Sequence, residues 1–215
     1  EEMLFNDREG FVKALNGVYI ELNTNELYGR NLTAGALDVM GQYYSVASSS
    51  HAFYNYGGLV YTGNDEKALF DNMWQKCYAV IACCNTIIEK CDENKAGLSP
   101  VWKGSIKGEA LALRAMLHFD MLRLFGPLTS ELDKESIPYQ TNSDQTVTPL
   151  LSGSEVIGLI LDDLKNAVGL LKDTDPYFVE EEFSDTDLNY RRFRMNYFAA
   201  KGLMARVQLW GGDKE

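Results

Sequence analysis

The sequence predicts an all-α protein made of stacked antiparallel helical hairpins, with long irregular loops. Three observations support this fold class. Apolar residues recur at three- and four-residue intervals through five long segments. Alanines lie on the predicted packing faces of two of these segments, where they let helix backbones approach closely. Helix-stopping pairs follow both segments, Gly126-Pro127 and Gly211-Gly212.

The first helix is predicted over residues 7–22, where apolar residues keep a helical spacing. Asn6, three residues before Glu9, is the expected cap of this helix. Residues 23–63 form the least regular stretch, rich in Asn, Thr, Gly and Ser, and a short helix is expected near 33–41.

Two long helices are expected to form a hairpin. The first opens at Asn64 and runs to about Cys91. The second begins at Ser99-Pro100, a cap residue followed by proline in the first turn, and ends before Gly126. Because the link over 92–98 is short, the two helices should pack antiparallel.

A second hairpin is predicted from helices over 154–172 and 194–210. The connection over 126–151 is irregular. The stretch over 173–190 is expected to be a solvated loop, because its acidic residues lack the spacing of a calcium-binding EF-hand. These acidic residues are Asp173, Asp175, Glu180, Glu181, Glu182, Asp185 and Asp187.

The cysteines are expected to be small apolar residues on a buried helical stripe. Cys77, Cys84 and Cys91 recur every seven residues, with Cys83 beside the second of them. Residues seven apart on a helix are separated by about 10 Å of rise, which is too far for a disulfide. A zinc site would require shorter ligand spacings.

The composition argues against several functional classes. The chain has 215 residues, of which 46% are hydrophobic, so it can bury a core of one sizeable domain. Its net charge of −11 disfavours nucleic-acid binding. The sequence also lacks an apolar run of the eighteen or so residues that a transmembrane helix needs.

Two segments carry a family resemblance. One contains Gly108-Glu109-Ala110, Leu113-Arg114-Ala115 and Phe125-Gly126; the other contains Arg194, Ala199-Ala200-Lys201 and Ala205-Arg206-Val207. In type and order they resemble the diagnostic helices of the SusD/RagB family, surface glycan-binding lipoproteins of Bacteroidetes. We expect these residues to pack helices together, with Glu109 and Arg114 pairing to neighbouring helices.

The resemblance implies a fold and a function. It implies a single N-terminal SusD-like domain over residues 1–215, with hairpins stacked as in tetratricopeptide repeats and further chain beyond it. The implied role is glycan capture for nutrient uptake as a surface-exposed outer-membrane lipoprotein, which delivers the ligand to a SusC-like TonB-dependent transporter. Membrane attachment would come only from an N-terminal lipid anchor that is absent from this sequence. The alternatives are a helical-repeat scaffold for protein interaction and the capture of peptides.

An aromatic-rich loop is the place where a sugar site can be argued. Sugar rings stack on aromatic faces, while Asn and Arg side chains bind hydroxyl groups. The expected ligand-binding residues are Tyr43, Tyr44, Tyr54, Tyr56 and Tyr61. Packing of these rings against the helices is the competing interpretation for each of them.

An enzymatic role is not expected, and no cofactor or metal is predicted. Glu109, His118 and Asp120 lie on one predicted helix, but the two-residue spacing of the last two points them to different faces. His118 is expected at a helix contact or on the surface. The sequence also lacks the local motifs of zinc proteases, serine hydrolases and P-loop enzymes.

Overall fold

The computed structural model describes residues 4–144, 146–180 and 183–212. The chain divides into two compact units: a main unit, Glu1–Leu15 with Ile81–Glu215, and a small unit, Asn16–Val80. The single domain expected over 1–215 stays a prediction.

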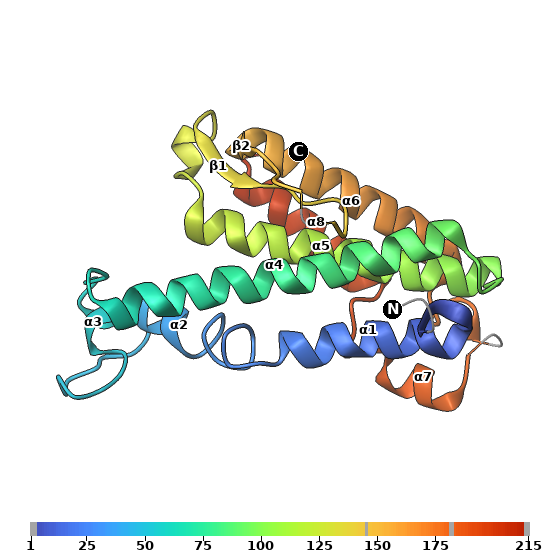
Figure 1. Ribbon diagram of the computed structural model, residues 1–215, viewed down its shortest axis with the longest axis horizontal. Coiled ribbons are helices and arrows are strands. Elements are labelled where there is room, and N and C mark those ends of the chain that lie inside the picture. The colour runs from blue at the N-terminus through green and yellow to red at the C-terminus, as the bar shows by residue number, and fades with distance from the viewer. Residues whose placement is uncertain (1–3, 145, 181–182, 213–215) are drawn as a thin grey trace. The chain divides into compact units, whose positions relative to one another are not determined.

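The fold class is confirmed, because long helices make up most of the chain (Figure 1). The helices are α1 (Arg8–Leu22), α2 (Ala36–Met40), α3 (Tyr54–Gly57), α4 (Asn64–Glu93), α5 (Pro100–Phe125), α6 (Gly153–Thr174), α7 (Asp185–Arg191) and α8 (Tyr197–Trp210), with 3-10 turns at Leu4–Asn6 and Thr129–Glu131. Strands β1 (Glu135–Pro138) and β2 (Leu150–Ser152) pair antiparallel, with Glu135 opposite Ser152. They lie within the connection for which the sequence predicted no regular structure.

Side-chain caps explain where the helices begin. Ser99 accepts a hydrogen bond from the backbone of Trp102, and Ser152 forms a capping box with Glu155. The prediction that Asn6 caps α1 is wrong, because the Asp7 carboxylate accepts the hydrogen bond from the backbone nitrogen of Gly10, at 2.8 Å. The last helix begins three residues later than predicted, because Asn196 caps it by accepting from the Ala199 backbone.

The helices of the main unit pack antiparallel. Two contacts join α5 to the end of α4: Lys107 pairs with Asp92, and Arg114 donates to Asn85. The later residue of α5 contacts the earlier residue of α4, so the two helices run in opposite directions. Helix α6 lies along α5 (Figure 1). Gly108 permits this approach, because an added Cβ would lie 2.8 Å from the Leu171 side chain.

A buried ion network joins the two family-diagnostic segments. The Glu109 carboxylate on α5 accepts hydrogen bonds from Arg191 and from Nε of Arg194, the latter at 2.7 Å. Arg191 also donates to both oxygens of Asp175, at 3.0 and 2.6 Å. Asp175 in turn accepts from the backbone nitrogen of Tyr197, at 2.9 Å. The network therefore fixes α5, the end of α6, α7 and the start of α8 against one another.

A second buried pair joins α5 to α6. Arg114 donates to both oxygens of Asp163, at 2.7 and 2.6 Å. The hydroxyl of Tyr139 donates to the same carboxylate, at 2.6 Å. Burial lowers the pKa of Arg114, but the bonds to Asp163 outweigh it and raise the pKa overall. The predicted pairing of Glu109 and Arg114 with neighbouring elements is thus confirmed.

His118 is buried at the contact between α5 and the residues after β1. Its Nε2 accepts from the Gln140 backbone at 3.0 Å, its Nδ1 lies 3.0 Å from the Arg114 carbonyl oxygen, and its ring stacks on Tyr139 with 3.9 Å between centroids. Burial lowers the pKa of His118 to about 3, against the opposing effect of the bond to the Arg114 carbonyl. His118 is therefore neutral and holds the chain after β1 against α5.

The cysteine stripe is largely as expected. Cys77, Cys84 and Cys91 are buried, whereas Cys83 is exposed because its adjacent position turns it away from the stripe. Burial raises the pKa of the Cys84 and Cys91 thiols to about 12.

The prediction of a solvated loop over 173–190 is wrong at two points. Asp175 is fully buried in the ion network, because Arg191 offers it a charged partner. Helix α7 forms at the end of this stretch, where Ser184 and Asp187 make a capping box. Glu181 and Glu182 lie outside the described residues.

Removing the Arg191 guanidinium should destabilise the protein strongly. The change Arg191→Met leaves the buried carboxylates of Glu109 and Asp175 with less positive charge, which should lower the free energy of unfolding by about 3–5 kcal/mol. Urea unfolding measures this change. Lys165→Met, which removes an exposed pair with Asp162, is the control and should leave the midpoint nearly unchanged. An Arg191→Met midpoint equal to that of the control would contradict a structural role for the network.

The stability of the fold should decrease as the pH decreases, because His118 is buried in its neutral form. The unfolded histidine takes up a proton near pH 6.5, while the folded one stays neutral down to about pH 3. The folded state is therefore favoured fully above pH 6.5 and loses up to about 1.4 kcal/mol per pH unit between 6.5 and 3. Urea unfolding at pH 7.5, 5.5 and 4.5 should show a shallower decline for His118→Gln than for the parent chain. Equal declines would show that His118 does not contribute.

Candidate functional site

The five predicted tyrosines all lie in the small unit, but they differ in exposure. Tyr43, Tyr44 and Tyr54 are 80%, 52% and 41% exposed, which leaves their rings open to a ligand. Tyr61 is half-buried. Tyr56 is only 2% exposed, so it is withdrawn from the candidate binding residues.

Ring packing accounts for the buried position of Tyr56. Its ring meets Phe53 edge to face with 5.8 Å between centroids, and it meets Phe70 at 6.0 Å. Tyr61 also packs edge to face on Phe70, at 5.5 Å. Burial, with the nearby charge of Glu66, raises the pKa of Tyr56 to about 12. Tyr56 and Tyr61 therefore anchor the loop to α4.

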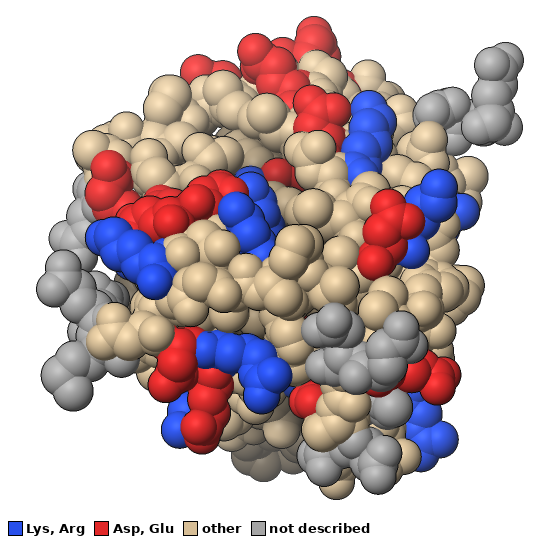
Figure 2. Space-filling view, turned by 90° about the vertical axis from the view of Figure 1, so that its right-hand side faces the viewer, with Lys and Arg blue, Asp and Glu red and all other residues tan. Residues whose placement is uncertain are grey.

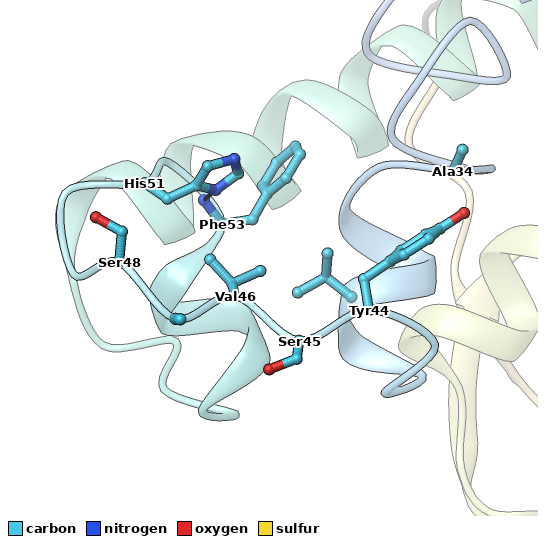
Figure 3. Close-up of a pocket in the computed structure, with 9 residues that line it drawn as sticks. Ala34, Tyr44, Ser45, Val46, Ser48, His51 and Phe53 are labelled. Atoms are coloured by element: carbon cyan, nitrogen blue, oxygen red, sulfur yellow. Dashed lines mark hydrogen bonds between the residues drawn. The ribbon is translucent and has the colours of Figure 1, made fainter.

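A first hollow of about 500 Å³ opens beside the chain segment 44–48. Figure 3 shows Tyr44 on one side of it and His51 with Phe53 on the other, while Val46 points into the space between them. The remaining lining residues are small or apolar: Ala34, Val39, Ser45, Ala47 and Ser48. The hollow thus presents aromatic and apolar surfaces with hydroxyl groups at its edge.

A second hollow, of about 420 Å³, shares Tyr44, Ser45 and Val46 with the first. It has a more polar lining, with the side-chain amides of Gln42 and Asn55 and the ring of Tyr54. Its other lining residues are Gly57, Gly58 and Val60. Because three consecutive residues line both hollows, one extended ligand could contact both.

Hydrogen bonds hold the polar groups of the second hollow in place. The Gln42 amide, at a left-handed backbone position with φ of 61°, donates to the Gly57 carbonyl at 3.0 Å. The Asn55 amide nitrogen donates to the buried Glu66 carboxylate at 2.7 Å. Such fixed groups reduce the conformational entropy that is lost when a ligand binds.

The sequence prediction missed several residues that line the hollows. Gln42, Asn55 and His51 carry the polar groups, and Val39 reaches the first hollow from α2. The only signal for them was the abundance of Asn, Gly and Ser around the tyrosines.

The residues considered for acid–base chemistry lie elsewhere and are already paired. Glu109 belongs to the buried ion network, and Asp120 pairs with Arg123. His118 is held between backbone groups. Within residues 4–144, 146–180 and 183–212, no group of three His, Cys, Asp or Glu side chains could hold a metal ion.

A second exposed aromatic surface lies in the main unit. Phe178 and Phe198 are 49% and 58% exposed, and their ring centroids lie 5.9 Å apart. Phe178 also meets Tyr197 edge to face at 5.3 Å, and Tyr177 meets Phe198 at 5.9 Å. No sequence pattern pointed to this group of rings.

Charge is mixed on the face drawn in Figure 2. Basic side chains there lie beside acidic ones and do not gather into a broad basic area. As for membrane insertion, none of the helices in the described part of the chain is both long and apolar enough to span a bilayer.

Comparison with known families gives a match along most of the chain. A family model, SusD-like_3, described as "Starch-binding associating with outer membrane", matches residues 11–209. A SusD-like protein of Bacteroides ovatus is 30% identical over 146 residues, which are 66% of this chain and 23% of that protein. SusD-like protein P38 of Formosa agariphila is 34% identical over 96 residues, 44% of this chain and 17% of that protein. The matched segments thus span a quarter or less of these relatives.

Solved structures show the same fold. A SusD-like carbohydrate binding protein of Bacteroides vulgatus superposes with a TM-score of 0.73 at 22% identity, covering 96% of this chain and 42% of that one. A SusD superfamily protein of Bacteroides thetaiotaomicron gives a TM-score of 0.69 at 21% identity, with 96% and 43% covered.

Two tyrosine substitutions should distinguish a ring that stabilises the fold by packing from a ring that is exposed to solvent. Tyr56→Ala removes a buried ring and should lower the free energy of unfolding by about 3 kcal/mol or more. Tyr43→Ala removes an exposed ring and should leave stability nearly unchanged. Thermal unfolding of both variants tests this assignment, and equal losses would contradict it.

Proposed function

The chain belongs to the SusD-like family, and on that premise we propose that it binds glycans at the cell surface without catalysing a reaction on them. The site we assign to this binding is the pair of hollows around Tyr44. Glycan capture there would serve nutrient uptake.

The observation that carries this proposal is the exposure of Tyr44 and Tyr54 at two adjoining hollows with fixed amide groups. A sugar ring stacked on one aromatic ring removes about 80 Å² of apolar surface, which contributes roughly 2 kcal/mol. A millimolar complex requires about 4 kcal/mol. Two stacked rings with a few hydrogen bonds therefore suffice for a weak site, and a polysaccharide with many repeats would strengthen it by avidity.

The chemistry of the hollows supports binding in preference to hydrolysis. Most glycoside hydrolases need two carboxyl groups that face each other across the scissile bond. The side chains that line the hollows are aromatic, aliphatic, amide, hydroxyl and imidazole groups. Such groups can hold a sugar but do not supply that pair.

Location and partner follow from the family as further parts of the proposal. The family description associates its members with the outer membrane. We propose a surface-exposed lipoprotein, anchored through an N-terminal lipid, that passes glycan to a SusC-like TonB-dependent transporter.

A second candidate function, protein interaction, is favoured by the exposed rings at Tyr177, Phe178 and Phe198. Exposed aromatic clusters are frequent at protein interfaces. This surface could contact a protein partner or a captured peptide while the hollows bind glycan, so the two functions are compatible.

Replacing Tyr44 should weaken glycan binding. Affinity electrophoresis against plant, host and microbial polysaccharides should show retardation of this chain by at least one of them. Tyr44→Ala should then raise the dissociation constant about tenfold or more, because the ring borders both hollows. That change corresponds to about 1.4 kcal/mol.

Tyr190→Ala is the matched control, since this tyrosine is 61% exposed but lies in the main unit. It should leave retardation unchanged. Absence of retardation across the whole panel, or equal weakening by both variants, would contradict the proposed site.

A further inference from the structure

The residues that line the two hollows include no Lys, Arg, Asp or Glu. The first presents two hydroxyls from serine, the phenol of Tyr44, the imidazole of His51 and apolar surface. The second presents the amides of Gln42 and Asn55 and the phenol of Tyr54. These groups exchange hydrogen bonds with sugar hydroxyls, but none of them is a lysine or an arginine, the side chains that carry a permanent positive charge for a carboxylate or a sulfate.

The charges adjoining the second hollow are unfavourable to anions. The Asn55 amide nitrogen is engaged by Glu66, a carboxylate with only 5% of its surface exposed. An acidic sugar placed against Asn55 would therefore approach a fixed negative charge in a region of reduced dielectric. The chain as a whole carries a net charge of −11, which adds a longer-range repulsion at low ionic strength.

The Arg30 guanidinium lies near the Phe53 ring, which lines the first hollow. Its guanidinium carbon is 5.8 Å from the centroid of the Phe53 ring, and its Nε donates to the Asn31 side chain at 3.2 Å. Arg30 is not among the residues that line the hollow.

We propose that the glycan taken at these hollows is a neutral chain, and that uronic-acid and sulfated glycans are discriminated against. This inference rests on the proposed function, because it concerns the same site. Its physical basis is the unequal desolvation of the two ligand classes. A neutral hydroxyl recovers its hydrogen bonds from the lining amides and hydroxyls, whereas a carboxylate loses water without gaining a cation. The two hollows, both of which Tyr44 lines, then bind neutral sugar chains by stacking and hydrogen bonding.

Isothermal titration with matched polysaccharides tests the inference. The probes are soluble starch, galactomannan and arabinoxylan, each beside its own carboxymethyl derivative. The neutral form of whichever polysaccharide binds should have a dissociation constant at least tenfold lower than its derivative. Raising sodium chloride from 50 to 500 mM should leave the neutral affinity nearly unchanged, because no ion pair contributes to it. A derivative that binds as tightly as its parent would overturn the inference.

Variants at Ser45, which is exposed and lines both hollows, test the cause. Ser45→Lys should raise the affinity for the carboxymethyl derivative severalfold, while the uncharged control Ser45→Asn should not. Arg30→Gln should leave the neutral affinity unchanged. If instead the parent chain binds the carboxymethyl derivative and Arg30→Gln abolishes that binding, Arg30 serves as an anion site and the inference fails.

Failure of this inference can be told from failure of the proposed function. Tight binding of an acidic polysaccharide that is lost in Tyr44→Ala would overturn only the neutral specificity. Absence of binding to every neutral and acidic probe would overturn both.

Discussion

The main unit depends on two arginines buried among carboxylates. Arg191 and Arg114 compensate Glu109, Asp175 and Asp163, each of which is almost wholly withdrawn from solvent. A carboxylate buried without such a partner would destabilise the fold by several kcal/mol. Glycine and alanine let the helices approach, but small residues tolerate sliding between helices. Each guanidinium donates to both oxygens of a carboxylate, so the helices can pair these groups in only one relative position. This explains why the diagnostic segments contain a glutamate and arginines as well as small residues.

Much of the helical architecture follows from the sequence, because five long segments carry a clear helical period and recognisable ends. Helix α7 was missed because seven residues inside an acidic stretch carry too little period to detect. The burial of Asp175 could not be foreseen either, since its partner Arg191 lies sixteen residues away. The strands β1 and β2 are only four and three residues long, too short for alternation to show.

The sequence indicated the stretch that holds the exposed tyrosines, but not the details of the hollows around them. Tyr54 and Tyr56 lie two residues apart on the single turn of α3, so they point in different directions, and one is exposed while the other is buried. The sequence shows no helical period there from which to assign the faces. The left-handed backbone of Gln42 and the bond from Asn55 to Glu66 are tertiary features. They position the polar groups that surround the exposed rings.

In the proposed function, glycan lies over the loop around Tyr44 in the small unit. Hydrogen–deuterium exchange of the chain, with and without the polysaccharide that binds most tightly, tests it most directly. We expect slower exchange in residues 42–60 on addition of glycan, with little change around Tyr197 and Phe198. Slower exchange confined to the aromatic surface of the main unit, with none in 42–60, would contradict it.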